Sequence, residues 1–181
     1  VISIMNDIIR ATNNGQMTAL VLVDLSAAFD TVEHSTLIDV LHRSFAVDGQ
    51  PLTWFKSYLS DRTQTFSTAG KQSTPLNVEC SVPQGSVLGP LEFISYTENI
   101  REIFDSFKIT HHLFADDKQL LKSSEIKDIN SVQLLLSSCI SVVRDWCSSR
   151  RLQLNASKTE LIWFGSHCKV TLISINFLTP T

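Results

Sequence analysis

Apolar residues recur along the chain with two different spacings, and together they predict a protein of mixed helices and strands. Helical spacing in VISIMNDIIRATNNG predicts an N-terminal helix whose apolar face carries Ile2, Met5, Ile8 and Ile9. Short apolar runs bounded by turn residues are typical of buried strands. The pattern predicts strands over residues 18–24, 108–114, 118–122 and 160–164, and its longest helix over residues 125–150.

The order of these elements predicts the fold class. Strand, helices, strand, strand, helix and strand form the split β-α-β-β-α-β arrangement of an α+β protein, and we expect segment 63–105 to be an insertion in its first crossover. Right-handed crossovers place the first strand between the third and the fourth, antiparallel to both. We therefore expect an antiparallel sheet with its helices packed on one face.

Two adjacent carboxylates, Asp116 and Asp117, interrupt the strand-forming stretch HHLFADDKQL. Side chains alternate across a strand, so both aspartates cannot face solvent within one half-buried strand, whereas a hairpin turn accommodates them. In the predicted sheet this turn, the end of the first strand and the entry to the fourth lie at one edge. Asp24 and Lys158 should therefore join the aspartate pair.

Three clustered carboxylates repel one another unless a cation lies among them, and oxygen ligands favour hard ions such as magnesium. Two magnesium ions held in this way stabilise the attacking and the leaving oxygens of phosphoryl transfer. The predicted chemistry is nucleotidyl transfer or phosphodiester cleavage. Taken singly, an Asp-Asp turn is usually a solvated turn and an Asp that ends a strand is usually a cap, so the prediction depends on their convergence.

The composition of the chain further limits the classes of protein to which it can belong. A chain of 181 residues with 43% hydrophobic content fits one domain with its own core, and its net charge of −3 mildly disfavours a stand-alone nucleic-acid binder. Its four cysteines form no C-x-x-C pair, which favours reduced thiols over a zinc site built from His111, His112, His167 and Cys168. Apolar runs such as ALVLV are too short to span a bilayer, so we expect an intracellular protein, nuclear or cytoplasmic.

Four motifs carry a family resemblance. The stretches LVLVDLSAAFDTVEH, SVPQGSVLGP, FADD and LQLNASKTELIWFG, in this order, resemble the reverse transcriptase of non-LTR (LINE-type) retrotransposons. The resemblance implies a polymerase palm with partial fingers over residues 1–165, followed by a tail of uncertain fold over 166–181. It also implies an RNA-directed DNA polymerase that transfers deoxynucleotides onto a primer 3′-hydroxyl, with an RNA template, a DNA primer and deoxynucleoside triphosphates as partners.

The resemblance also implies roles for individual residues. Asp24 matches the first metal-binding aspartate, and Asp116 and Asp117 match the catalytic pair, so these three would hold two Mg²⁺ ions, with Mn²⁺ as a substitute. Lys158 matches the lysine after the long helix that could protonate the pyrophosphate leaving group, although a solvated cation at a helix end is a close rival.

Three further residues match substrate-binding positions of the family. Phe29 matches the aromatic residue that excludes a ribose 2′-hydroxyl, and Gln84 with Gly85 matches the loop beside the incoming nucleotide and the template base. A core phenylalanine and an ordinary turn are the alternatives for these positions. The sequence does not indicate an oligomeric state.

Three departures from the family pattern leave the activity open. Ser81 replaces a customary glycine, Glu92 a customary apolar residue and Lys118 a small polar one. Lys118 could pair with an aspartate and compete with metal. Because we expect fingers and thumb to be missing around the palm, the alternative is a catalytically inactive retrotransposon remnant. A two-metal nuclease or nucleotidyl cyclase is a further alternative, which the P-Q-G loop and Phe29 disfavour.

Overall fold

The computed structural model describes residues 2–26, 28–83, 85–115, 117–165 and 171–174. The chain divides into two compact units. Unit 1 comprises Val1–Ser26 and Glu98–Thr181, and unit 2 comprises Ala27–Thr97. The inserted segment is therefore larger than the predicted 63–105, because the two helices that follow the first strand belong to unit 2 with the rest of the insertion.

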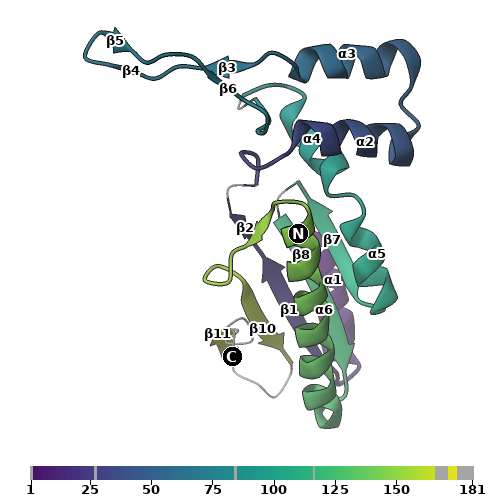
Figure 1. Cartoon of the computed structure of the whole chain (residues 1–181). Helices are drawn as coiled ribbons and strands as arrows, with labels where there is room; N and C mark the ends of the chain where they lie inside the picture. Colours follow the sequence, from purple (N-terminus) through teal and green to yellow (C-terminus); the bar gives the residue numbers. More distant parts are fainter. Residues whose placement is uncertain (1, 27, 84, 116, 166–170, 175–181) are drawn as a thin grey trace. The chain divides into compact units, whose positions relative to one another are not determined.

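Unit 1 is built on a five-stranded antiparallel sheet in the order β11-β10-β1-β8-β7 (Figure 1). Its strands are β1 (Met17–Val23), β7 (Thr110–Phe114), β8 (Asp117–Ser124), β10 (Glu160–Phe164) and β11 (Thr171–Ser174). The predicted position of the first strand, between the third and fourth and antiparallel to both, is confirmed. Strand β11 extends the sheet at the β10 edge, so part of the predicted tail is ordered into the sheet.

The remaining elements of unit 1 are helices and one short strand pair. They are α1 (Ile2–Asn13), α5 (Ile100–Ser106), the 3-10 turn η1 (Ile126–Asp128), α6 (Ile129–Ser149), β2 (Leu25–Ser26) and β9 (Gln153–Leu154). Strand β2 pairs antiparallel with β9, which ties the segment after β1 to the segment after α6.

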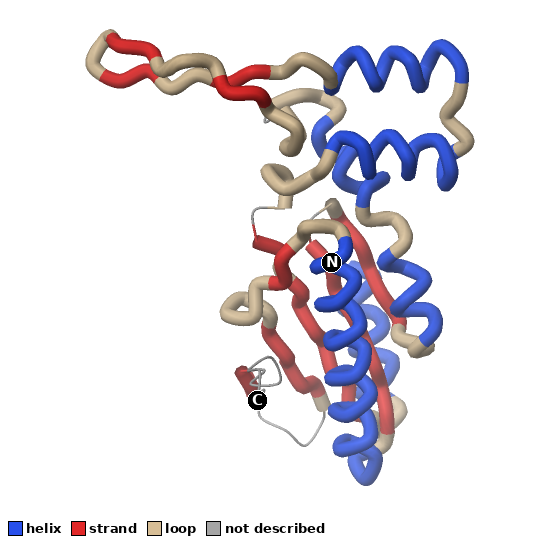
Figure 2. The backbone as a smooth tube through the Cα atoms, in the orientation of Figure 1, coloured by secondary structure: helices blue, strands red, loops and turns tan. Residues whose placement is uncertain are grey.

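Helices cover both faces of the sheet, so the prediction that they pack on one face is wrong. Ile4 and Ile8 of α1 form an apolar cluster with Leu20 and Leu121 on one face. Figures 1 and 2 show α6 on the opposite face. The physical reason is strand β1, which is buried at six of its seven positions and therefore needs an apolar cover on each side.

The buried face of α1 also differs from the predicted one. Ile4, Ile8 and Ala11 are buried, whereas Ile2, Met5 and Ile9 are exposed. The buried residues follow an i, i+4, i+7 spacing, which is the stripe that fits against a single sheet face.

Helix α6 is apolar along much of its length. The segment Ile126–Ser149 is long and apolar enough to cross a membrane by length and composition alone, a test that core helices of soluble proteins also pass. The face of α6 that is buried carries Val132, Leu136, Cys139, Ile140, Val143 and Cys147. Burial raises the pKa of the Cys139 thiol to about 12 and that of Cys147 to about 11, so both thiols stay protonated at neutral pH.

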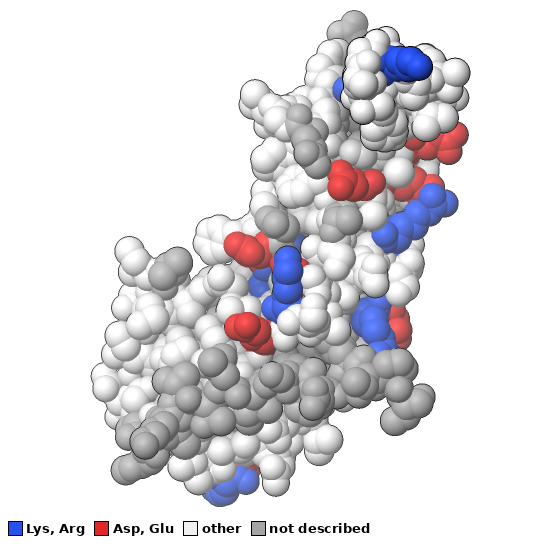
Figure 3. All heavy atoms as spheres, turned by 90° about the vertical axis from the view of Figure 1, so that its left-hand side faces the viewer, with Lys and Arg blue, Asp and Glu red and all other residues white. Residues whose placement is uncertain are grey.

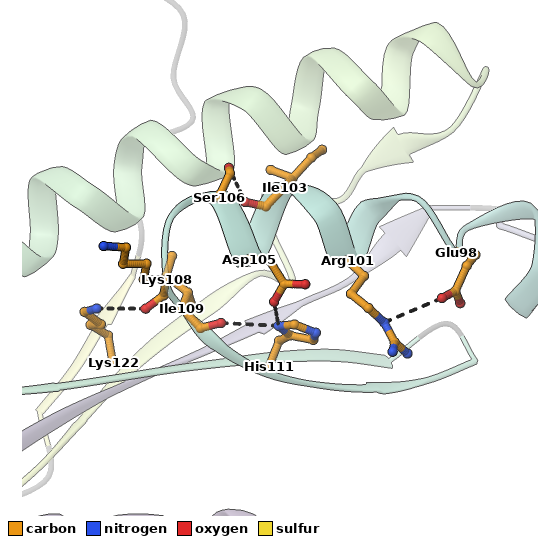
Figure 4. Close-up of polar contacts among 9 residues, drawn as sticks. All are labelled: Glu98, Arg101, Ile103, Asp105, Ser106, Lys108, Ile109, His111 and Lys122. Atoms are coloured by element: carbon orange, nitrogen blue, oxygen red, sulfur yellow. Dashed lines mark hydrogen bonds and ion pairs between the residues drawn. The ribbon is translucent and has the colours of Figure 1, made fainter.

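Polar contacts fix the end of α5 against strands β7 and β8 (Figure 4). Lys108 adopts a left-handed φ of 52° just after the helix, and the ammonium of Lys122 donates to its carbonyl at 2.8 Å. The ring of His111 lies 3.2 Å from the Ile109 carbonyl and 3.8 Å from the Asp105 carboxylate. These contacts give His111 a structural role.

Unit 2 contains three helices and a hairpin. The helices are α2 (His34–Phe45), α3 (Gly49–Leu59) and α4 (Gly89–Tyr96). The hairpin consists of β3 (Thr63–Gln64) paired with β6 (Leu76–Asn77), and β4 (Ser67–Thr68) paired with β5 (Lys71–Gln72).

Glu92 of α4 is an ionisable side chain enclosed in unit 2. It is 2% exposed, and neither carboxyl oxygen has a hydrogen-bond partner among the described residues. Burial raises the pKa of its carboxyl above the ordinary value of 4.5, and the Arg62 guanidinium opposes this shift. A buried polar group without a partner costs about 1–3 kcal/mol, so Glu92 destabilises the fold at a position where an apolar residue would stabilise it.

We predict that Glu92→Leu raises the free energy of unfolding at pH 7 by about 1–3 kcal/mol. Because the folded-state pKa of Glu92 is raised, its contribution to stability is greatest below about 4.5 and is lost as pH rises through the folded-state value. Urea denaturation of the wild type and of Glu92→Leu across this range should therefore show a stability gap that widens with pH.

The matched control is Glu79→Gln, which removes an exposed carboxylate of the same unit. Parallel stability curves for the wild type and Glu92→Leu would contradict the burial of a raised-pKa carboxyl.

Candidate functional site

Asp24 directly follows β1, and a turn from another part of the chain holds its backbone. The Asn155 N–H donates to the Asp24 carbonyl at 2.9 Å, and the Asp24 N–H donates to Thr159 Oγ1 at 3.5 Å. The Thr159 hydroxyl in turn donates to the Asn155 carbonyl at 2.8 Å. Asn155 and Thr159 therefore position Asp24, a role that the sequence interpretation missed although both residues lie in the LNASKT stretch that it singled out.

The predicted turn between strands two and three is present. Phe114 of β7 pairs with Asp117 of β8, and Ala115 inside the turn has a φ of 50°. Asp116 lies outside the described residues. The last residue pair between β1 and β8 joins Val23 to Lys118. Asp24 comes directly after Val23 and Asp117 directly before Lys118, so both lie just beyond this pair at the same end of the two antiparallel strands.

Three of the four residues predicted to converge line one cavity of about 170 Å³. They are Asp24, Asp117 and Lys158, and Leu22, Val23, Lys118 and Gln119 complete the lining. Asp24 is half-buried, whereas Asp117 and Lys158 are exposed. A carboxylate directly after β1, a carboxylate at the start of β8 and a lysine from the turn before β10 therefore share one small, partly enclosed space.

The donor set of this cavity fits a hard divalent cation. Two carboxylates supply oxygen ligands only, which is the chemistry that magnesium selects. No group of three or more His, Cys, Asp or Glu side chains suitable for a metal occurs among the described residues. The third predicted ligand, Asp116, lies outside the described residues. Of the three predicted ligands, the structure therefore describes Asp24 and Asp117.

Lys118 brings a buried positive charge to the same hairpin. Its side chain is 1% exposed, and its ammonium donates to the Ala115 carbonyl at 3.0 Å. The ammonium also acts on α6, where it lowers the pKa of Cys147 against the larger opposing effect of burial. The suggestion that Lys118 pairs with an aspartate and competes with metal stays a prediction.

The predicted substrate-binding residues lie in unit 2. The ring centroid of Phe29 lies 4.9 Å from that of Phe93 in α4, and the Phe29 carbonyl accepts a hydrogen bond from the Val82 N–H at 2.9 Å. The segment that carries Phe29 is therefore joined to the P-Q-G loop. Gly85 in this loop has a φ of 78°, a conformation that favours glycine, and Gln84 lies outside the described residues.

The loop also explains one departure from the family pattern. Ser81 has a φ of 93°, where a residue with a side chain is strained and glycine is not. Backbone contacts hold it there, because its N–H donates to the Val32 carbonyl at 2.9 Å and its carbonyl lies 2.9 Å from His34 Nε2. The customary glycine at this position therefore has a conformational reason.

Comparison with known families and curated proteins gives consistent matches. The family model described as "Reverse transcriptase (RNA-dependent DNA polymerase)" matches residues 3–177. The chain is 31% identical over 160 residues to the probable RNA-directed DNA polymerase from transposon BS of Drosophila melanogaster, covering 84% of this chain and 17% of that protein. It is 27% identical over 169 residues to the RNA-directed DNA polymerase from mobile element jockey of the same organism, covering 90% and 18%.

A third relative comes from a different organism. The chain is 29% identical over 154 residues to the Pol polyprotein from the type-1 retrotransposable element R2 of Popillia japonica, covering 79% of this chain and 20% of that protein. The chain therefore spans a fifth or less of the length of these three relatives.

A solved structure shows the same fold. The apo telomerase of Candida tropicalis, truncated from its C-terminal domain, matches with a TM-score of 0.65 at 16% identity, covering 94% of this chain and 37% of that one. At this identity the match concerns the arrangement of helices and strands alone.

We predict that Thr159→Val lowers the free energy of unfolding by about 1–2 kcal/mol, because it removes the hydroxyl that joins the Asp24 N–H to the Asn155 carbonyl. Chemical denaturation measures the change. The matched control is Ser157→Ala, which removes an exposed hydroxyl bonded to the Asn155 side chain at 2.7 Å and should change stability by less than about 0.5 kcal/mol. Equal effects of the two substitutions would show that the Thr159 hydroxyl does not hold the turn.

Proposed function

Because the chain belongs to the reverse transcriptase family, with relatives from non-LTR retrotransposons, we propose that it is the palm portion of an RNA-directed DNA polymerase. The observation that carries the proposal is the cavity shared by Asp24, Asp117 and Lys158. These residues come from three distant parts of the sequence, and the sequence pattern predicts each of them for the site.

In this proposal Asp24, Asp116 and Asp117 hold two Mg²⁺ ions, for which Mn²⁺ can substitute. The metal would supply stabilisation of charge on the attacking and leaving oxygens of phosphoryl transfer. The chain supplies the ligands, and the hydrogen bonds from Asn155 and to Thr159 fix the backbone from which the Asp24 carboxylate extends.

The reaction is the attack of a DNA primer 3′-hydroxyl on the α-phosphate of a deoxynucleoside triphosphate, directed by an RNA template. A new P–O bond forms to the primer, the bond to pyrophosphate breaks, and the hydroxyl proton passes to solvent water. Lys158 is the proposed acid that donates its ammonium proton to the departing pyrophosphate oxygen, since it lines the carboxylate cavity and its side chain is exposed.

Phe29, Gln84 and Gly85 form the proposed nucleotide-binding segment. A ring at position 29 would exclude a ribose 2′-hydroxyl, the group that distinguishes ribonucleotides from deoxynucleotides. The hydrogen bond between Val82 and the Phe29 carbonyl supports this assignment, because it joins the aromatic residue to the loop that carries Gln84 and Gly85.

A second candidate function is a catalytically inactive member of the family, and Lys118 favours it. Lys118 lines the same cavity as Asp24 and Asp117, and an ammonium near carboxylates weakens their attraction for a metal ion. Figure 3 shows basic and acidic side chains next to one another in small groups on one face, and the described residues form no broad basic surface there to hold nucleic acid.

Primer extension distinguishes the two candidates. With an RNA template, a DNA primer, deoxynucleoside triphosphates and Mg²⁺, the polymerase proposal predicts extension by the wild type. It also predicts a loss of at least about a hundredfold in Asp24→Asn and Asp116→Asn, because each removes a carboxylate proposed to hold Mg²⁺. Asp145→Asn is the control, since Asp145 is an exposed carboxylate on α6.

Lys118→Thr tests the second candidate. Extension by this variant and none by the wild type would show that Lys118 inactivates the site. Equal extension by the wild type, Asp24→Asn and Asp116→Asn would contradict the polymerase proposal.

A further inference from the structure

The hairpin of unit 2 extends away from the three helices of that unit, as Figures 1 and 2 show. We call residues 62–78 the arm. Every residue from Thr63 to Asn77 is exposed, so neither face of the hairpin packs against the helices. An isolated two-stranded hairpin is only marginally stable in water, and its surfaces are therefore available to a partner.

The charge of the arm is opposite to that of the remaining chain. Arg62 and Lys71 are its only charged residues, and no carboxylate occurs between Asp61 and Glu79. The arm therefore carries +2, and because the whole chain carries −3, the remaining residues carry −5. Hydroxyl and amide side chains fill most other positions of the arm, and such groups commonly contact phosphate oxygens.

Aromatic side chains line the approach to the arm along α3. Trp54 stacks on Tyr58 with a centroid distance of 5.2 Å and an angle of 9° between the rings. The Arg62 guanidinium follows, 5.1 Å from the Tyr58 ring centroid. Trp54 is 52% exposed, and Phe66 on the arm is 63% exposed. Exposed rings beside cations are the groups on which single-stranded bases stack.

We propose that the arm and the exposed face of Trp54 bind a single strand of nucleic acid. Arg62 and Lys71 contact its phosphates, and Trp54 and Phe66 stack on its bases. The choice of a nucleic acid as the partner rests on the proposed polymerase function, whereas the location rests on the exposure, charge and aromatic residues of the arm. This surface adds a strand-binding element to a chain that otherwise carries an excess of acidic residues.

Fluorescence anisotropy with a labelled RNA strand of about 16 nucleotides tests the proposal. The titrations contain EDTA, so that binding does not depend on the carboxylate cavity. Lys71→Glu should weaken binding at least about fivefold and lower the slope of log affinity against log salt by about 0.7, the value expected for one lost phosphate contact. Phe66→Ala should also weaken binding at least about fivefold, because it removes one stacked base.

Matched controls separate this surface from general effects of charge and apolarity. Arg43→Glu makes the same change of charge on α2, and Leu134→Ala removes an apolar side chain that is 71% exposed on α6. Both should change the affinity by less than about twofold. The same titrations with single-stranded DNA distinguish recognition of the phosphates and bases from recognition of the RNA 2′-hydroxyl.

Several results would overturn the proposal. One is equal weakening by Lys71→Glu and Arg43→Glu, and another is no binding by the wild type. Loss of a dimer in Phe66→Ala, measured by sedimentation, with unchanged RNA binding would assign the arm to self-association. If the wild type binds RNA through the arm but does not extend a primer, the polymerase proposal alone is contradicted. If the wild type, Lys71→Glu and Phe66→Ala extend a primer equally and no RNA binding is detected, the proposal for the arm alone is contradicted.

Discussion

The antiparallel pairing of β1 with both β8 and β10 brings together Asp24, Asp117 and Lys158, the residues of the carboxylate cavity. Pairing with β8 brings the end of β1 beside the β7–β8 turn, and the turn before β10 bonds to the backbone of Asp24. The apolar side chains of β1 make this arrangement stable, because the strand is buried on both faces. The carboxylates would repel one another, but the buried apolar side chains of β1, which lie away from them, hold the strands that carry them in place.

The sequence predicted the strands well because each is a short apolar run between turn residues, and the strand order follows from the handedness of crossovers. It did not predict the second helical layer, although the nearly continuous apolar character of TALVLV indicates a strand buried on both faces. The meeting of Asp24, Asp117 and Lys158 was predictable, because each lies at or beside the end of a strand whose place in the sheet the sequence indicates. The supporting bonds of Asn155 and Thr159 were not, because the contacts of short polar side chains depend on the tertiary structure.

The departures from the family pattern have physical consequences that the sequence could only suggest. Ser81 takes a positive φ that explains the customary glycine, and the enclosed Glu92 finds no hydrogen-bond partner for its carboxyl oxygens within the described part of the chain. Lys118 is buried at the hairpin of the aspartate pair. Glu92 and Ser81 affect the stability of unit 2, whereas Lys118 lies in the carboxylate cavity itself. Lys118 is therefore the departure on which the choice between an active and an inactive family member depends.

We propose that Asp24 and the Asp116-Asp117 turn form one metal site. Titration with Mn²⁺, followed by electron paramagnetic resonance of the free ion, tests this proposal without requiring activity. We expect saturable binding that Asp24→Asn and Asp117→Asn each weaken by about tenfold or more, with no change in Asp145→Asn. Equal Mn²⁺ affinity in the wild type, Asp24→Asn and Asp117→Asn would contradict it.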